Sequence, residues 1–258
     1  MPTIELDSVT LYYDQKGQGP AILLLHGLGS CGQDWLFQTP ELSKHYEVHT
    51  PDFRGHGRSE KKGPYTVLQC VEDMRSYIEK QAIGPVHIVG LSFGSFVALQ
   101  LALKYPHLVK SLVLTGTTSR IKDIGFWPLF LRGALLYICP MNTVAHFVSK
   151  TLFPDPEQVA LYTRCRLRIA SCQKAIYTAY CHDLVHFDVT DGLKSLTSPL
   201  TIIVGQNDQL LPRFHAEKIK QAIPSAHLVV LKGARHAAPL DSPELFNHQL
   251  LLRIKNNQ

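Results

Sequence analysis

The sequence predicts an α/β fold in which a mostly parallel sheet is flanked by helices and carries an inserted helical lid. Continuous apolar runs such as Ala21–Leu25 and Leu200–Val204 are typical of strands that are buried on both faces. These runs alternate along the chain with segments of helical periodicity, which is the pattern of a parallel sheet. The alternation lapses for about eighty residues, and an irregular stretch of that length inside a compact domain is normally functional. We therefore expect a core over 1–117 and 199–258, interrupted by a lid over 118–198.

The individual elements follow in chain order. Two short strand-like runs open the chain, and the turn Gly17-Gln18-Gly19-Pro20 follows them. Before the lid, strands are expected at Ile4–Leu6, Val9–Tyr13, Ala21–Leu25, Val48–Pro51, Val86–Val89 and Ser111–Leu114, and helices at Tyr65–Gln81 and Phe93–Tyr105. After the lid, strands are expected at Leu200–Val204 and His227–Leu231, and helices at Phe214–Ala222 and Ser242–Lys255. Within the lid, Asp155-Pro156-Glu157 predicts a helix start, with aspartate at the cap and proline in the first turn.

Composition narrows the possible partners and compartments. The chain has 258 residues, of which 45% are apolar and 18% charged, as in an ordinary compact protein. The net charge of +5 is too diffuse to indicate nucleic acid, but it allows an acidic partner at a local patch. The start of the chain lacks the basic and apolar regions of a signal peptide. The most apolar stretch, Ile124 to Pro140, is too short for a membrane span and is interrupted by Pro128 and Arg132. We expect it to cover an apolar pocket, with an interfacial helix as the alternative.

The six cysteines indicate a reducing compartment. They show no CxxC spacing, and with no export signal we expect free thiols and a cytoplasmic protein. Cys181-His182 resembles half of a metal site, but no second ligand pair stands near it. We therefore expect a structural role for this pair and no metal.

The segment with the clearest chemistry is Gly90-Leu91-Ser92-Phe93-Gly94. It places G-x-S-x-G between a buried strand and a helix, where a serine in a strained turn projects above the sheet. The helix N-terminus there favours developing negative charge. The pattern alone is weak, but the strand before it and the helix after it make Ser92 the candidate nucleophile. The competing interpretation is a glycine-rich turn with a capping serine.

A serine nucleophile needs a base and an acid. His236 follows the last expected strand, in a loop of small residues that returns to the carboxyl edge of the sheet, and we assign it as the base. Asp208 follows the preceding strand, so the order Ser…Asp…His is the one expected for this chemistry. Asp208 as a simple helix cap and Asp123 as the acid are the alternatives.

The oxyanion of such a reaction needs two donors. The backbone N–H of Phe93 is one, and the loop His26-Gly27-Leu28-Gly29-Ser30 should supply the other from Leu28. Because only one base is needed, we expect His26 to shape this loop by hydrogen bonding. No metal or organic cofactor is required.

At this point the chain resembles the α/β-hydrolase superfamily, in particular its small lidded esterases and lactonases. Besides the serine, acid and base segments, the match rests on His26–Gly29 and Pro51–Ser59. In the family the second of these motifs shapes a loop near the active site, so the resemblance implies an architectural role for His56. Ser95 stands where many relatives have a further glycine. Serine at position 92 argues against the dehalogenase and epoxide-hydrolase branches, which carry aspartate there.

The lid suggests a substrate. Its aromatic and aliphatic residues suit an acyl pocket, with Trp127 and Phe130 as the expected contacts, or they only pack the lid onto the core. Arg164 and Arg168 share a helix face and repel each other, and nothing local compensates for this. We therefore expect an acidic partner there, with a plain solvated face as the alternative. The basic residues concerned are Arg164, Arg166, Arg168 and Lys174.

A basic lid over an apolar pocket resembles the esterases that demethylate pimeloyl-[acyl-carrier protein] methyl ester in biotin synthesis. The resemblance implies a serine carboxylic-ester hydrolase on which an acidic acyl-carrier protein docks at the lid. A general carboxylesterase, enol-lactonase or carbon–carbon bond hydrolase acting on a small substrate is the first alternative. A non-catalytic ligand-binding protein with the same fold is the second.

Overall fold

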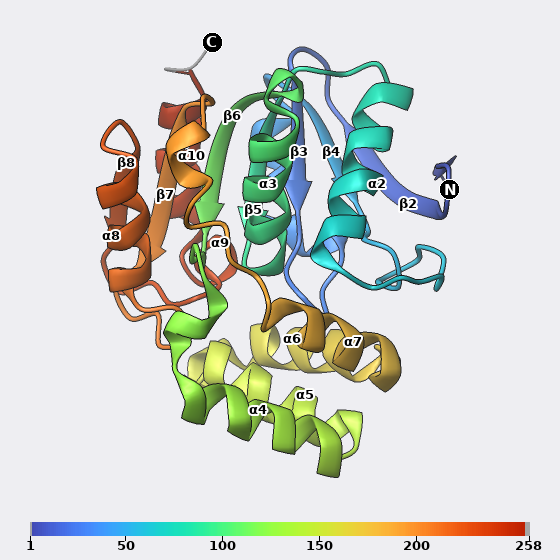
Figure 1. Ribbon diagram of the computed structural model, residues 1–258, viewed down its shortest axis with the longest axis vertical. Coiled ribbons are helices and arrows are strands. Elements are labelled where there is room, and N and C mark those ends of the chain that lie inside the picture. The colour runs from blue at the N-terminus through green and yellow to red at the C-terminus, as the bar shows by residue number, and fades with distance from the viewer. Residues whose placement is uncertain (1, 256–258) are drawn as a thin grey trace.

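The computed structural model is built on one eight-stranded sheet in which the strands follow the order β1-β2-β4-β3-β5-β6-β7-β8 (Figure 1). The structure describes residues 2–255, apart from the side chains of Phe126, Phe130 and Arg132. The strands are β1 (Thr3–Glu5), β2 (Thr10–Lys16), β3 (Ala21–Leu25), β4 (Glu47–Pro51), β5 (Val86–Leu91), β6 (Val109–Thr115), β7 (Leu200–Gly205) and β8 (His227–Leu231). β1 and β2 pair antiparallel, β2 pairs antiparallel with β4, and the remaining neighbours are parallel. The predicted fold class is therefore confirmed.

Helices cover both faces of the sheet because its strands are apolar on both. Leu23 and Leu25 of β3 face a core shared with α2 (Val67–Lys80), α3 (Phe93–Lys104) and α8 (Arg213–Ala222). Ile22 and Leu24 of the same strand face a second core with α1 (Thr39–Leu42) and α10 (Pro243–Lys255). This alternation is the two-residue period of a strand, and it explains why a continuous apolar run predicted a strand buried on both sides.

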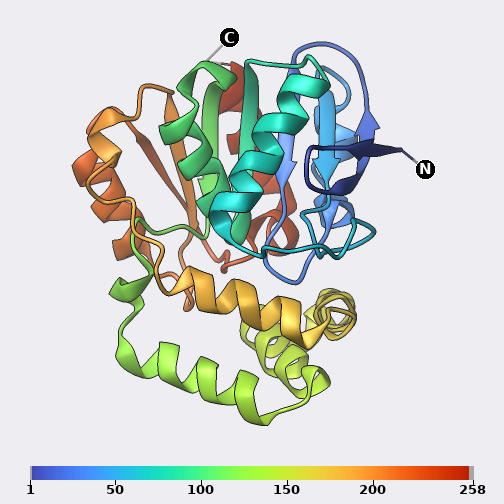
Figure 2. The same cartoon turned by 45° about the vertical axis from the view of Figure 1, so that its right-hand side comes forward.

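The segment between β6 and β7 forms four helices below the carboxyl edge of the sheet (Figures 1 and 2). They are α4 (Phe126–Ile138), α5 (Met141–Leu152), α6 (Val159–Ala170) and α7 (Lys174–Leu184). A small core of their own, which includes Leu136, Val144 and Ile169, holds them together. We keep 118–198 as the proposed bounds of this lid.

The lid leaves and rejoins the core through a short paired segment, which we call the neck. Arg120 and Asp188 form an isolated antiparallel bridge. On either side of it, the amide of Ile121 donates to the carbonyl of Phe187 at 3.1 Å, and that of Val189 to Ser119 at 2.9 Å. Residues 119–121 therefore lie beside 187–189, and the last short helix, Leu193–Ser195, lies between the neck and β7.

The helix start predicted at Asp155 is present, but the cap is not. Asp155 precedes the helical turn Pro156–Gln158, as predicted, but its side chain makes no capping hydrogen bond. Its carboxylate instead accepts from Nη2 of Arg235 at 3.1 and 3.2 Å, an ion pair between lid and core.

In the described part of the chain, none of the helices combines the length and the hydropathy needed to cross a bilayer.

Candidate active site

Ser92 lies at the sharp turn between β5 and α3, with φ 52° and ψ −113°. A non-glycine residue with positive φ is strained, and such strain concentrates at functional sites. The flanking glycines permit the turn: a Cβ on Gly90 would lie 2.6 Å from the Cα of Ser95, and one on Gly94 would lie 2.2 Å from the carbonyl oxygen of Leu25. Ser95 is buried and its hydroxyl donates to the carbonyl of Ser92 at 2.6 Å, which adds a tie inside the turn.

The end of β6 connects Ser92 to His236. The amide of Ser92 donates to the carbonyl oxygen of Thr115 at 2.9 Å. The next residue, Gly116, has φ +58°, and a Cβ there would lie 2.6 Å from Cε1 of His236 and about as close to the two ring nitrogens, at 3.0 and 3.1 Å. The imidazole therefore rests on the backbone of Gly116. The serine and histidine predicted from the sequence lie against two consecutive residues of one strand end.

His236 is in turn bound to Asp208. The Nδ1 of His236 lies 2.9 Å from Oδ2 of Asp208, and both side chains are buried. The other carboxylate oxygen accepts from the amides of Leu210 and Leu211, each at 2.9 Å. An ionised carboxylate only accepts, so Nδ1 of the neutral imidazole carries the proton and Nε2 keeps a lone pair. Asp208 thus also holds the turn after β7, but it does not cap the following helix, whose N-cap is Pro212 and has no side-chain capping bond.

Asp123, the alternative acid, lies elsewhere. Its carboxylate accepts from Nε of Arg120 and from Nζ of Lys218, both at 2.8 Å. These two cations lower the pKa of Asp123. His236 is paired with Asp208, so Asp123 is excluded as its hydrogen-bond partner.

The loop over 26–30, which we call the oxyanion loop, lies beside the serine. A Cβ on Gly27 would lie 3.7 Å from the Cβ of Ser92. His26 holds this loop, because its Nδ1 donates to the carbonyl of Gly27 at 2.8 Å and its Nε2 accepts from the amide of Phe53 at 3.0 Å. Complete burial lowers the pKa of His26 to about 4, so the ring is neutral and structural.

His56 belongs to the same buried group. Its ring centroid lies 5.2 Å from that of His26, and the ring stacks on Phe93. Burial, followed by the nearby His26, lowers the pKa of His56 to about 3. An architectural role is thus supported for both histidines, and neither is available as a base.

Arg164 and Arg168 share an acidic partner, which corrects the expectation that nothing compensates their charge. Nε of Arg164 lies 2.7 Å from Oδ1 of Asp34, and Nε of Arg168 lies 3.7 Å from the same oxygen. Asp34 lies in the turn after the oxyanion loop, 130 positions earlier in the chain, where no local pattern could reveal it. Lys174 donates to the carbonyls of Tyr137 and Cys139. Of the four basic residues, Arg166 is the one whose side chain is exposed.

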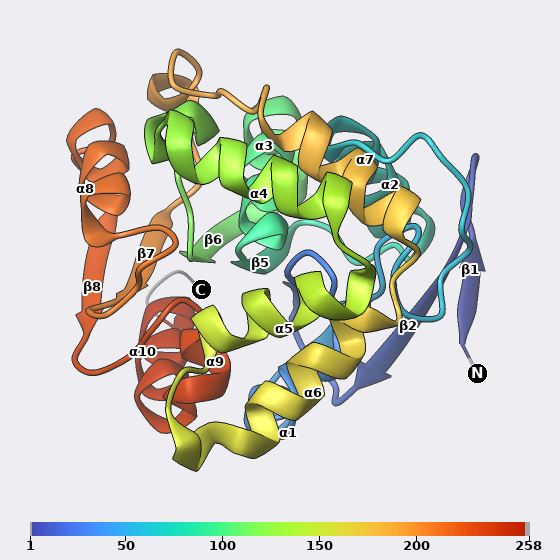
Figure 3. The same cartoon turned by 90° about the horizontal axis from the view of Figure 1, so that it is seen from below.

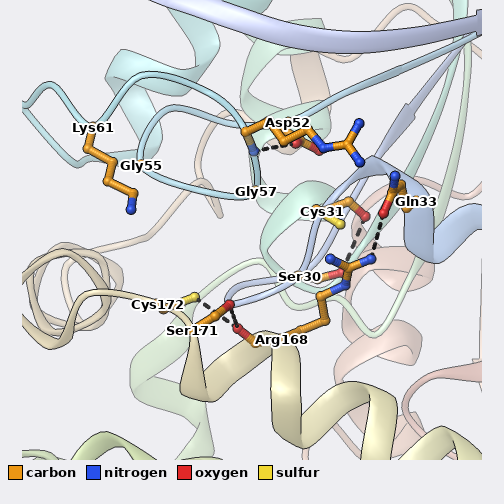
Figure 4. Close-up of a pocket in the computed structure, with 11 residues that line it drawn as sticks. Ser30, Cys31, Gln33, Asp52, Gly55, Gly57, Lys61, Arg168, Ser171 and Cys172 are labelled. Carbon is orange, nitrogen blue, oxygen red and sulfur yellow. Dashed lines mark hydrogen bonds between the residues drawn. The ribbon is translucent and has the colours of Figure 1, made fainter. Parts of the chain in front are cut away.

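A polar cavity of about 120 Å³ separates this part of the lid from the core (Figure 4). Arg168 and Cys172 of the lid face Cys31 and Asp52 across it. Burial raises the pKa of Cys31 to about 12 and that of Cys172 to about 11, so neither thiol is activated. Among residues 2–255, no three His, Cys, Asp or Glu side chains are grouped to hold a metal.

Of the two expected acyl contacts, Trp127 does not lie in an enclosed pocket. Trp127 is 68% exposed on α4. The side chain of Phe130 lies outside the described residues. A wide groove of about 680 Å³ runs along α6, with Val159 and Leu167 beside Arg164 and Arg168.

Comparison with known proteins gives one family and several relatives. The α/β hydrolase fold family model matches residues 20–243. A pimeloyl-[acyl-carrier protein] methyl ester esterase of Vibrio vulnificus is 26% identical, over 95% of this chain and 98% of the relative. One of Aeromonas hydrophila is 28% identical, over 90% of this chain and 94% of the relative. Among solved structures, the enol-lactonase from Burkholderia xenovorans superposes with a TM-score of 0.91 at 24% identity, covering 98% of this chain and all of that one, a likeness of fold.

Proposed function

The chain belongs to the α/β-hydrolase fold family and is a hydrolase, and from this premise we propose that it cleaves carboxylic esters through an acyl-enzyme on Ser92. The observation that carries the proposal is the buried hydrogen bond between Asp208 and His236. It fixes the imidazole as the tautomer that accepts a proton at Nε2, while Gly116 sets the ring against the strand end that also holds Ser92.

The reaction would proceed in two stages. Nε2 of His236 takes the proton of the Ser92 hydroxyl as the oxygen attacks the ester carbonyl. The tetrahedral oxyanion is held by the amides of Leu28 and Phe93, and His236 then protonates the departing alcohol. Water attacks the acyl-enzyme by the same route and releases the acid.

The proposed substrate is the methyl ester of a pimeloyl group carried by an acyl-carrier protein. Two relatives that bear this name match nearly the whole chain. The groove on α6 supports the proposal, since it combines exposed Val159 and Leu167 with arginines, a chemistry suited to an acidic helix with an apolar face. Because Asp34 already binds Arg164 and Arg168, we assign the larger share of carrier attraction to exposed Arg166.

The catalytic part is tested with a fluorophosphonate probe and a short p-nitrophenyl ester. We expect the probe to label Ser92, and Ser92→Ala to lower kcat by several thousand-fold. For the base, His236→Gln is compared with His215→Gln, since His215 is also buried but bonds Thr118 instead of an acid. Loss of activity in both histidine variants, or an active Ser92→Ala protein, would refute the assignment. A wild type that is neither labelled by the probe nor active on the ester would favour a receptor that only retains the fold.

The substrate is tested by mass spectrometry of methyl-pimeloyl carrier protein incubated with the wild type and with Ser92→Ala. We expect loss of the methyl group with the wild type only. Arg166→Glu should slow this reaction and spare the p-nitrophenyl ester. No loss of methyl from an enzyme that cleaves the small ester would discard the carrier and leave a general esterase, lactonase or carbon–carbon bond hydrolase.

A further inference from the structure

Helix α4 exposes a row of large apolar side chains, which we call the outer ridge. Their exposed fractions are 68% for Trp127, 63% for Leu131, 89% for Tyr137 and 77% for Ile138. Trp127, Leu131 and Ile138 are spaced i, i+4 and i+11, so they form one stripe along the helix. A contiguous exposed apolar surface marks an interaction site, whereas single exposed apolar side chains scattered over a protein are ordinary.

The ridge is not the face that holds the helix in place. Leu136 is buried in the lid core and Leu129 packs against the main core, half a turn away from Trp127. The helix is thus apolar on both sides, a pattern normally found where both sides are covered. Figures 1 and 3 show α4 on the side of the lid that faces away from the sheet.

The charge of the lid segment that contains the ridge points to an anionic partner. Residues 118–154 contain four basic residues (Arg120, Lys122, Arg132 and Lys150) and one acidic residue, Asp123. Their net charge of +3 is more than half of the +5 of the whole chain. Asp123 is already bound to Arg120 and Lys218, and the side chains of Lys122 and Lys150 are exposed.

We propose that the outer ridge of α4 docks the protein on an anionic lipid surface. An exposed apolar helix face with a tryptophan and a tyrosine, in a lid segment that carries exposed lysines, suits the interface of a bilayer, where apolar side chains enter the acyl boundary and cations meet the headgroups. α4 would lie in the plane of the interface, since its other face stays packed in the lid. The proposal does not depend on which ester the enzyme cleaves.

The test uses phosphatidylcholine vesicles with and without phosphatidylglycerol. The chain has two tryptophans, and Trp35 is 2% exposed, so a blue shift of tryptophan emission on adding vesicles reports Trp127. We expect this shift, and co-sedimentation, with the anionic vesicles, and weaker binding at higher salt. The double variant Leu131→Ser, Ile138→Ser should bind at least about ten-fold more weakly, because two large side chains no longer enter the apolar layer.

The matched control is Leu252→Ser, which removes a leucine that is 42% exposed on α10. It should bind as the wild type does, and all variants should keep the wild-type Tm and the same rate on a soluble ester. Absence of wild-type binding to anionic vesicles, or equal binding by the double variant, would overturn the proposal. So would sedimentation velocity showing a wild-type dimer that the double variant dissociates, since the ridge would then be a self-association surface.

Discussion

The contact between Gly116 and His236 provides the sharpest test of the proposed active site, through Gly116→Ala. The added Cβ would lie 2.6 Å from Cε1 of the imidazole, and ordinary contact begins at 3.4 Å, so the ring must move by about 0.8 Å. The backbone of Gly116 is held by its position at the end of β6, and the ring is the part free to shift. The bond from Nδ1 to Asp208 would change, and so would the position of Nε2 relative to Ser92.

The expected loss is a kinetic one. A misplacement near 1 Å in a catalytic group costs about a hundred-fold in rate, so we expect kcat to fall by about ten- to a hundred-fold with KM within a few-fold. Alanine at positive φ also costs roughly 1–2 kcal/mol of stability. That cost must be separated from the effect on the imidazole.

The control variant Gly233→Ala separates the stability cost of alanine at positive φ from the displacement of the imidazole. Gly233 has φ +78° in the loop that leads to His236, and a Cβ there meets nothing within 4 Å. We expect both variants to lower Tm similarly, but only Gly116→Ala to lower kcat and to shift the pH at which kcat/KM is half-maximal. Equal kcat losses in the two variants, or full activity of Gly116→Ala, would refute the positioning role.

Three further predictions concern the acid, the buried histidines and the lid. Asp208→Asn should reduce kcat on a p-nitrophenyl ester by about 10³–10⁴-fold with little change in KM, because the amide favours the wrong tautomer of its partner; a loss below ten-fold would contradict this. In the folded protein the pKa of His26 is near 4 and that of His56 is near 3, against an ordinary value of 6.5. Their contribution to stability is therefore complete above about pH 6.5 and is lost as the pH falls toward 4. His26 alone should account for roughly 3 kcal/mol, so Tm scans between these pH values should fall less steeply for His26→Gln; parallel curves would argue against it. Asp34→Ala should lower Tm by about 2–4 °C, since two lid arginines lose their partner, while the control Arg166→Ala should not; equal effects would remove Asp34 as a lid tie.

Local sequence patterns made the sheet and the turn at Ser92 predictable. Every core strand was expected within a few residues of its observed bounds, because an apolar run with turn residues on both sides determines a buried strand. The turn at Ser92 was predictable for the same reason, since strand, glycines and helix are contiguous. Residues that meet through the fold were harder to predict. Asp208 was chosen over Asp123 because it follows the end of a strand, whereas Asp123 begins the lid, and the structure places the Asp208 carboxylate on the imidazole.

The errors arose where a side chain had a distant partner. The cap pattern at Asp155 marked the start of a helix correctly, but Arg235, 80 positions later, takes the carboxylate. Asp34 likewise pairs with Arg164 and Arg168, which appeared to have no acidic partner. In α4, apolar residues occur all around the helix, so the sequence could not indicate which side would face outward. Trp127 was expected inside a pocket and lies on the outer ridge.

The neck allows the lid segment to be altered with little effect on the path of the core strands. Its two sides, 119–121 and 187–189, are joined by backbone hydrogen bonds, so the ends of the intervening segment lie within a few ångströms of each other. Ser92, Asp208 and His236 all lie outside that segment, on loops of the core. Helices α4, α5 and α6 thus form a module whose side chains can be rebuilt for a new substrate or surface, whereas α7 packs Ile176 and Tyr180 into the main core and is tied to it.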